Sequence, residues 1–226
     1  DFATLAHRLR FSIDYFNKTT KDGLLKKTLP QYDGGGTYWV NACEVVNRGV
    51  DFTIDAHILK QKDLNWNSSF TGTYLKNKVT SLDNIPFVQG YSPAIGLMGD
   101  VTRIVVGQPI GAFYLYQWTG LDATGHDTYA DLDGSGTLSE GDRTFCGKAN
   151  PTFTLGWNNQ LSWRNWDLNL FFTGAFGAKR LNLMRYFAAS MNGASKFITL
   201  KEAYYQSFGK TDNPMFPAVN VTNNNY

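Results

Sequence analysis

The sequence lacks the features that identify most nucleic-acid-binding, helical membrane and disulfide-rich proteins. Its 21 Lys and Arg residues nearly balance 19 Asp and Glu residues, so a formal net charge of +2 gives no electrostatic argument for a nucleic-acid partner. No run of about 18 apolar residues is present, which excludes a transmembrane helix. The two cysteines, Cys43 and Cys146, are too few for a disulfide framework. They form either one bridge or, as we expect, two thiols.

Catalytic motifs are also lacking. His7, His57 and His126 are isolated in the sequence, and there is no Gly-x-Ser-x-Gly or His-Glu-x-x-His motif. The "GGG" at residues 34–36 has no strand–helix context, so we expect a loop there rather than a phosphate cradle. We therefore expect that the protein is not an enzyme.

The first residues, "DFATLAHRLR", lack the basic region and apolar core of a signal peptide. The sequence instead begins almost directly on a strand-like pattern. We therefore expect this chain to be a segment of a longer protein.

Aromatic residues are abundant, at 15%, and apolar and polar side chains alternate along five segments. In the first segment, Leu9, Phe11, Ile13 and Tyr15 alternate with polar residues. A period of two predicts a β-strand with one apolar and one polar face. The pattern predicts five antiparallel strands, near residues 7–16, 48–59, 64–75, 152–163 and 166–176.

The connections between these strands are of two kinds. The segments "KQKD" and "RN" are tight hairpin turns, which we expect on the same side of the sheet. The other connections are long, at about 30 residues after Phe16, about 75 after Tyr74 and about 50 after Phe176, which is unusual in a compact soluble domain. Alternating short and long connections are typical of an outer-membrane β-barrel with short periplasmic turns and long extracellular loops.

Aromatic placement agrees with a barrel, because Trp66, Trp163 and Trp166 lie beside the two short turns, where an interfacial girdle is expected. The alternation also predicts which side chains face lipid and which face the lumen. We expect the lipid-facing set to include Phe70, Leu168, Leu170 and Phe172, and the lumenal set Thr71, Asn169 and Thr173.

A soluble β-sandwich has the same alternation of apolar and polar residues. A soluble, calcium-stabilised, carbohydrate-binding sandwich is therefore the alternative to a barrel.

The segment "TLKEAYYQSFG" has capping-box spacing between Thr199 and Glu202 and a glycine, Gly209, suited to a left-handed turn. It predicts a short helix in the last loop.

The segment "DLDGSGTLSEGD", residues 131–142, has the register of a calcium-binding EF-hand loop. Oxygen-bearing side chains occupy positions 1, 3, 5 and 12, a glycine occupies position 6, and position 7 supplies a carbonyl. We predict a structural Ca²⁺ site of modest affinity, because position 5 is neutral and position 12 is shorter than the usual Glu. The predicted ligands are Asp131, Asp133, Ser135, Thr137 and Asp142.

The flanks of this loop do not predict amphipathic helices, so a helix–loop–helix sensor is not expected. Two interpretations remain for the loop. It either binds a metal ion and rigidifies a long connection, or it is an Asp/Gly-rich turn closed by its own side-chain hydrogen bonds.

The exposed aromatic residues also have two interpretations. Trp39, Tyr116 and Trp118 either stack on sugar rings or pack within loops.

The segments "VGQPIGAFYLYQWTGLD" (residues 106–122) and "YADLDGSGTLSEGDRTFCGKANPTFTLGWNNQLSWRNWDLNLFFTGAFG" (129–177) resemble the SusC/RagA family of TonB-linked outer-membrane transporters. The family has a Gly-x-Pro-x-Gly-x-Phe-Tyr segment, a D-x-D-G-x-G loop, an Asp-Arg pair, a Gly-x-x-x-Pro segment and a membrane hairpin in this order. "DYFNKTTKDGLL" (14–25) and "NACEVVNRGVDFTI" (41–54) also resemble family segments. Leu115 stands where the family commonly has Gly, and Ser135 where it often has Asp.

The resemblance implies an all-β fold: residues 1–226 form an incomplete portion of one transmembrane β-barrel domain, with residues 77–150 as a long extracellular loop. It implies import of large nutrients, either glycans and other oligosaccharides or peptides, with a SusD-like surface lipoprotein as partner. It further implies outer-membrane localisation in a Gram-negative, Bacteroidetes-like cell, contact with outer-membrane lipid, and a TonB complex that acts through a more N-terminal region. The family's plug domain, signal peptide and closing C-terminal strands are expected outside this sequence.

Overall fold

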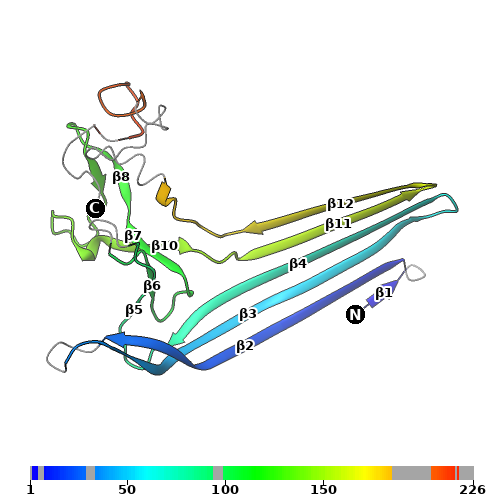
Figure 1. The fold of residues 1–226 in the computed structure, drawn as a ribbon, viewed down its shortest axis with the longest axis horizontal. Coiled ribbons are helices and arrows are strands. Elements are labelled where there is room, and N and C mark those ends of the chain that lie inside the picture. Colours follow the sequence, from blue (N-terminus) through cyan, green and yellow to red (C-terminus); the bar gives the residue numbers. More distant parts are fainter. Residues whose placement is uncertain are drawn as a thin grey trace. The chain divides into compact units, whose positions relative to one another are not determined.

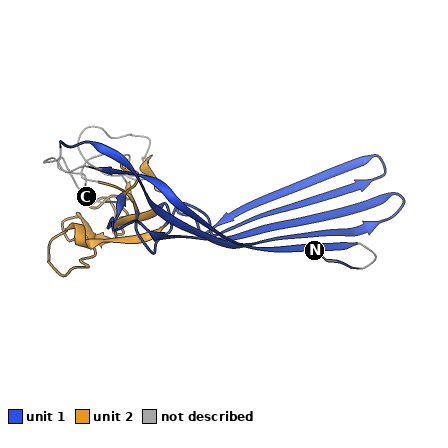
Figure 2. Ribbon diagram, turned by 90° about the horizontal axis from the view of Figure 1, so that it is seen from below, with its two compact units in different colours: residues 1–88, 104–111, 148–179 blue, residues 89–103, 112–147, 180–226 orange. Residues whose placement is uncertain are grey.

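The computed structural model describes residues 2–4, 8–28, 34–93, 99–184, 205–216 and 218. The chain divides into two compact units, which Figure 2 distinguishes by colour. Unit 1 comprises residues 1–88, 104–111 and 148–179, and unit 2 comprises residues 89–103, 112–147 and 180–226. In the described part of the chain, no helix is long and apolar enough to cross a membrane.

Unit 1 is built on one antiparallel sheet of six strands in the order β1-β2-β3-β4-β11-β12. Figure 1 shows β2, β3, β4, β11 and β12 running side by side. The strand bounds are β1 Phe2–Thr4, β2 Leu9–Thr28, β3 Thr37–Lys60, β4 Leu64–Ser81, β11 Phe153–Trp163 and β12 Trp166–Phe176.

The five predicted strands are confirmed in position and direction. The two hairpin turns also lie at the same end of the sheet, because Leu64, just after the first turn, pairs with Trp163, just before the second. Arg164, in the second turn, has a φ of 52°, and its backbone N–H donates to the Asp63 carbonyl in the first turn. The first strand has an additional partner, β1, that the alternation did not indicate.

Three strands are longer than predicted. β2 continues from Phe16 to Thr28, β3 begins at Thr37 rather than near residue 48, and β4 continues to Ser81. Alternation is visible only where one face is apolar and the other polar. Beyond Phe16 the sequence reads "NKTTKDG", which is polar on both faces, although backbone pairing with β3 continues. Residues 77–81 of the segment expected as a long loop therefore belong to β4.

The hydrophobic core of unit 1 is small and lies at the end of the sheet away from the hairpin turns. It contains Leu25, Ala42, Cys43, Val45, Val79 and Leu82, with Val40, Ile85, Val88 and Ile104 packed against it. Elsewhere the apolar face of the sheet is exposed, with Ile13 66% and Phe172 51% accessible. A β-sandwich buries this face under a second sheet, so the alternative of a soluble sandwich is wrong for the described residues.

The described residues of unit 2 contain short strands, the 3₁₀ turn η2 and the helical residues 183–184 and 205. The strands β10-β7-β6-β5 form one sheet and β8-β9 a hairpin. Residues 199–204 of the expected helix lie outside the described residues. Of the rest, Tyr205 is helical, whereas Ser207 and Phe208 form isolated β-bridges, so the helix does not extend to Gly209, although Gly209 has the expected positive φ (78°). The bounds are β5 Val88–Gln89, β6 Thr102–Ile104, β7 Ala112–Tyr116, β8 Trp118–Leu121, β9 Asp127–Tyr129, η2 Glu140–Asp142 and β10 Arg143–Lys148.

Candidate functional site

One face of the six-stranded sheet carries a continuous apolar band. Residues that pair directly across antiparallel strands share a face, so the register links one row through five strands: Phe11, Ile54, Phe70, Trp157 and Phe172. The rings contact one another, with centroids 5.8 Å apart for Phe52 and Phe70 and 5.6 Å apart for Trp157 and Phe172. The predicted set Phe70, Leu168, Leu170 and Phe172 therefore shares one face, and Thr71, Asn169 and Thr173 share the opposite face.

Aromatic residues mark both ends of this band. At the hairpin end Trp163 pairs directly with Trp166, which is 75% exposed. At the other end one row contains Tyr15, Val50, Tyr74, Phe153 and Phe176. The expected placement of tryptophans beside the turns is thus observed, and the second aromatic row is a feature that the sequence alone did not single out.

The separation of the aromatic rows can be calculated along β11, whose 11 residues run from Phe153 to Trp163. At about 3.4 Å per residue the rows are about 34 Å apart along the strand. A strand tilt of about 45° reduces this to about 24 Å along the membrane normal. The apolar band of an outer-membrane barrel is about 25 Å tall, so the band fits the hydrocarbon layer of a bilayer.

The opposite face of the sheet is polar and contains a hollow of about 370 Å³. Ser69 donates to the Asp55 carboxylate across 2.6 Å, and His57 Nδ1 lies 2.5 Å from Asn67 Oδ1. Asn158 Oδ1 is buried in the same region and has no hydrogen-bond partner among the described residues. A polar, hydrated surface is what the lumen of a wide barrel requires.

The predicted calcium loop folds into a compact arrangement of carboxylates in unit 2. One carboxylate oxygen from each of Asp131, Asp133 and Asp142 can be chosen so that all three lie within 4.8 Å of one another. Backbone N–H groups orient these side chains: Gly136 donates to Asp131 (2.9 Å), Ser135 to Asp133 (2.9 Å). None of the three carboxylates forms an ion pair with a Lys, Arg or His in the part of the chain that is described.

Asp142 anchors the end of this loop. Its side chain is fully buried and accepts from the backbone N–H groups of Leu132 (2.7 Å) and Ser139 (2.7 Å). Ser139 caps the 3₁₀ turn and donates to Asp133 Oδ2 across 2.7 Å. The two ends of the loop are therefore joined through Asp142, as position 12 of a calcium loop would join them.

The remaining predicted ligands, Ser135 and Thr137, lie in the exposed part of the loop. Ser135 Oγ donates to the Thr137 carbonyl across 2.9 Å. A calcium ion holds its oxygens at about 2.3–2.6 Å, so oxygens on opposite sides of the ion are about 4.6–5.2 Å apart. The carboxylate spacing fits such an ion, and an ionised carboxylate retains further lone pairs after it accepts one N–H.

Hydrogen bonds favour the ionised forms of Asp133 and Asp142. The Ser139 hydroxyl, followed by the Ser135 side chain and backbone N–H, lowers the pKa of Asp133 to about 2. The Ser139 backbone N–H, with those of Leu132 and Asp133, lowers the pKa of Asp142 against the opposing effect of burial. Ionised oxygens are the form that a hard divalent cation binds.

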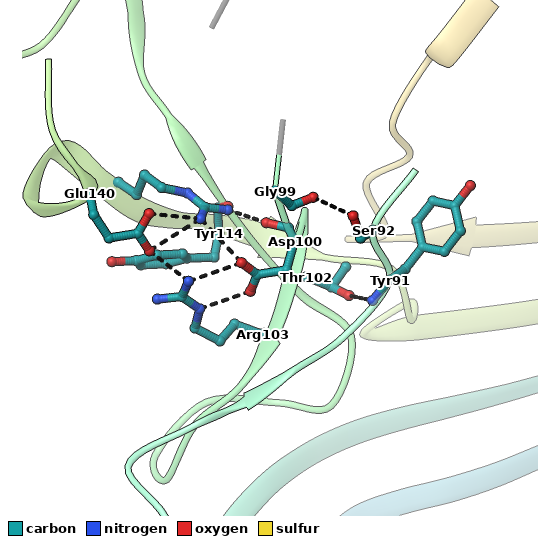
Figure 3. Close-up of polar contacts among 9 residues, drawn as sticks. Tyr91, Ser92, Gly99, Asp100, Thr102, Arg103, Tyr114 and Glu140 are labelled. Carbon is teal, nitrogen blue, oxygen red and sulfur yellow. Dashed lines mark hydrogen bonds and ion pairs between the residues drawn. The ribbon is translucent and has the colours of Figure 1, made fainter. Parts of the chain in front are cut away.

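A second charged cluster in unit 2, shown in Figure 3, was not identified from the sequence. Asp100 accepts two hydrogen bonds from Arg103, at 2.9 and 3.0 Å, and one from Arg143 Nη1 at 3.2 Å. Glu140 accepts from Arg103 at 2.6 Å and from Arg143 at 3.2 Å. Both guanidinium groups lie against the Tyr114 ring, with Arg103 Cζ 4.1 Å from its centroid.

The charges of this cluster balance, because two arginines face two carboxylates. Burial opposes ionisation of Asp100, but hydrogen bonds and charges from Arg103 and Arg143 outweigh it and lower its pKa. Arg143 Nη2 also donates to the Asp100 and Tyr114 carbonyls, so the cluster joins β7 to the residues that follow the loop. One member of this cluster could have been found from the sequence, since Arg143 belongs to the Asp-Arg pair that resembles the family pattern.

The other residues considered from the sequence are not brought into one site. No disulfide joins Cys43, which is buried in unit 1, and Cys146, which is half-buried in unit 2. Trp39 is exposed, and Trp118 Nε1 donates to Asp127 at 2.8 Å. Tyr116 packs edge-on against Tyr129, at 5.9 Å between centroids. His7 lies outside the described residues.

No sequence model of a protein family matches the chain. The chain is 32% identical over 199 residues to TonB-dependent receptor P3 of Formosa agariphila, an alignment that covers 80% of this chain and 20% of that receptor. It is 27% identical over 180 residues to TonB-dependent receptor SusC of Bacteroides thetaiotaomicron, which covers 75% of this chain and 18% of SusC.

Solved structures share the fold. The structure of the RagAB peptide transporter matches 97% of this chain and 25% of its own chain, with a TM-score of 0.77 and 23% identity. The RagAB peptide importer in the "closed-closed" state matches 98% of this chain, also 25% of its own, with a TM-score of 0.78 and 22% identity. The chain thus spans about a fifth to a quarter of the length of these relatives, and its open all-β sheet is an incomplete barrel.

Proposed function

The chain belongs to the SusC/RagA-type TonB-dependent receptors, which are transporters rather than enzymes, and we propose that unit 1 is part of the wall of the barrel through which such a receptor imports large nutrients. The observation that carries this proposal is the two-faced sheet. An apolar band about 24 Å tall, with aromatic rows at both ends, fits a bilayer. The polar face fits a hydrated passage.

The same observation supports a membrane localisation. A face that exposes Ile13, Phe172 and Trp166 to water would be an unusually large apolar patch for a soluble protein. In the outer membrane the same side chains contact lipid, and the tryptophans lie at the interface. The short turns then face the periplasm, and the long connections, including unit 2, face outward.

We infer two classes of substrate, oligosaccharides and peptides. The RagAB transporter is described as a peptide importer, and the resemblance to SusC-type receptors supports oligosaccharides as the other class. The partner we propose is a SusD-like surface lipoprotein that docks on the outward-facing side. TonB is proposed to act through a region that lies outside this sequence.

The transport proposal is tested in the source cell with the complete receptor. A strain from which the receptor gene has been deleted should lose uptake of one of two fluorescent pools, oligosaccharides or oligopeptides, and regain it when the gene is restored. Affinity purification of the restored receptor should recover a lipoprotein. Unchanged uptake of both pools in the deletion strain would contradict the transport role.

We also propose that the loop of residues 131–142 binds a structural Ca²⁺ ion. Asp131, Asp133 and Asp142 would supply carboxylate oxygens, with Ser135 and the Thr137 carbonyl completing the set. The carboxylate spacing and the absence of any ion pair to these groups among the described residues support this role. The ion would supply the positive charge that this cluster lacks and so rigidify the loop.

A further inference from the structure

The face of unit 1 that carries the apolar band also carries basic residues. They lie beyond the aromatic row that contains Tyr15 and Tyr74, on the side away from the hairpin turns. The next row after Tyr15, Val50 and Tyr74 contains Arg48 and Lys76, and the row after that contains Lys78. Both strands keep regular pairing here, because the register shifts lie only at Glu44/Val45 and His57/Leu59. These three cations therefore share the face of the aromatic row.

Among the described residues, no carboxylate forms an ion pair with these cations. The ion pair that unit 1 forms among its described residues joins Lys21 to Glu44, and it does not include Arg48, Lys76 or Lys78. All three side chains are exposed, and Arg48 Nε donates to the neutral Asn17 side chain at 3.1 Å.

Arg48 and Lys76 are also direct partners across β3 and β4. Like charges directly opposite each other destabilise a sheet. The arrangement is therefore unfavourable by itself, and an external anion that contacts both side chains would remove this repulsion.

The height of the three cations matches the headgroup layer of a bilayer. They lie two to four residues beyond the aromatic row, or about 7–14 Å along strands that rise about 3.4 Å per residue. With a tilt of about 45° this is about 5–10 Å above the apolar band. The headgroup region extends about 5–7 Å beyond the hydrocarbon on each side.

The hairpin end of the same sheet has a different charge pattern. Its turn residues include both signs, Lys62, Asp63 and Arg164, and its strand residues Lys60 and Asp167 lie on the polar face, where they pair with Asn65 and Ser162. General interfacial anchoring by Lys and Arg would act at both ends. On the apolar face between Val46 and Val50 of β3 and between Tyr74 and Lys78 of β4, by contrast, the charged residues are all cations, which favours an anionic surface.

We propose that Arg48, Lys76 and Lys78 form a binding surface for the phosphate groups of anionic lipid headgroups in the leaflet at the outward end of the barrel. The guanidinium group provides paired donors and the ammonium groups compact charges, both of which suit phosphate. This inference rests on the proposed membrane function of unit 1. It adds a lipid class and the three residues that select it.

The test uses the complete receptor in detergent, titrated with diphosphoryl lipid A, with phosphatidylcholine and inorganic phosphate as comparison probes. Each cation near an anionic surface contributes roughly a fivefold gain in affinity. The triple variant R48Q/K76Q/K78Q should therefore bind lipid A about 100-fold more weakly than wild type. The matched control K60Q/K62Q, at the hairpin end, should bind it like wild type.

Insertion into phosphatidylcholine vesicles separates this inference from the proposed function. The triple variant and wild type should both insert, as measured by protection from added protease. Insertion of both with equal affinity for lipid A would overturn the lipid inference alone. Failure of both to insert would overturn the barrel function and the inference with it. Full competition by inorganic phosphate at equal phosphate concentration would indicate a free-anion site and also overturn the inference.

Discussion

The two units of the chain differ in the polar side chains that they bury, although both bury apolar ones. In the described residues, every buried charged or polar residue belongs to unit 2: Asp100, Arg103, Asp142, Arg143 and Ser207. Unit 1 buries only the six apolar residues of its small core, while it exposes isoleucine, leucine, phenylalanine and tryptophan over most of one face. This difference shows that the two units are adapted to different solvents.

For unit 1, the hydrophobic effect of water cannot explain the fold, because the apolar face is not removed from water by protein. In the proposed barrel, lipid provides the apolar surroundings, and the backbone ladder satisfies the polar groups of the strands. Unit 2 instead folds around ion pairs and carboxylates that accept backbone N–H groups, an arrangement suited to an aqueous side. Each of the following changes should therefore affect one unit and spare the other.

The largest effect is expected in unit 2 for Asp100→Ala. This substitution leaves Arg103 and Arg143 buried with only Glu140 as a carboxylate partner. Removal of one partner of a buried ion pair costs about 3–5 kcal/mol. Hydrogen exchange across residues 99–116 and 140–148 should rise strongly, with little change in β11 and β12.

Asp212→Ala is the matched control, because Asp212 is exposed in unit 2 and outside the cluster. It should leave hydrogen exchange of these segments unchanged. Equal exchange in Asp100→Ala and Asp212→Ala would show that the charged cluster does not stabilise unit 2.

The next largest effect is expected in unit 1 for Leu170→Arg. An Arg at a lipid-facing position near the membrane midplane costs about 2–4 kcal/mol, and the adjacent lumen-facing Asn169→Arg should cost far less. Urea titrations of the complete receptor refolding into lipid vesicles measure both values. If the two variants refold with the same midpoint, the assignment of the two faces is wrong.

A smaller, local effect is expected from calcium. Affinity in the range of extracellular modules, about 10⁻⁴–10⁻³ M, should slow hydrogen exchange of residues 129–143 when calcium is added. Asp131→Ala should abolish this protection and leave the strands of unit 1 unchanged, because the loop makes no contribution to their ladder. Equal exchange with calcium and with chelator in wild type would identify the loop as an ordinary Asp/Gly turn.

The smallest effect is a pH dependence of the same loop. Because the pKa of Asp133 falls to about 2 in the folded loop, from about 3.9 in an unfolded chain, its hydrogen bonds stabilise the loop fully above about pH 4. This stabilisation should be lost as the pH falls from about 4 toward 2. Chelator-treated wild type should show this loss in hydrogen exchange, and Asp133→Ala should show a smaller loss, because the pKa of Asp142 is also lowered in the folded loop. A variant with the same pH profile as wild type would contradict the role of Asp133.

Much of unit 1 could be predicted from the sequence, because period-two alternation reports directly on a strand with two different faces. Phe70 and Thr71 were assigned to opposite faces in this way, and the register agrees. The extensions of β2, β3 and β4 could not be predicted, because they lack a regular alternation: β2 continues with the polar run "NKTTKDG", whereas β3 begins with the mostly apolar run "TYWVNACEVV". The strand β1 was also missed, since only three of its residues pair.

Unit 2 was less predictable. The spacing of Asp131, Asp133 and Asp142 indicated that their carboxylates converge, and they do. The cluster of Asp100, Arg103, Glu140 and Arg143 depends on contacts between residues up to 43 positions apart, which no local pattern reports. The Asp100/Arg103 and Glu140/Arg143 spacings are local, but a pair three residues apart is common on any surface.

Site-directed spin labelling of β12 tests most directly whether the apolar face of unit 1 contacts lipid. Labels would be placed singly at residues 167–173 of the complete receptor in lipid vesicles, after Cys43 and Cys146 are replaced by Ser. Collision with oxygen, which concentrates in lipid, should be high at residues 168, 170 and 172. Collision with a water-soluble nickel chelate should be high at residues 167, 169, 171 and 173. A profile without this period of two, or with the two sets reversed, would contradict the assignment of the sheet to a membrane barrel.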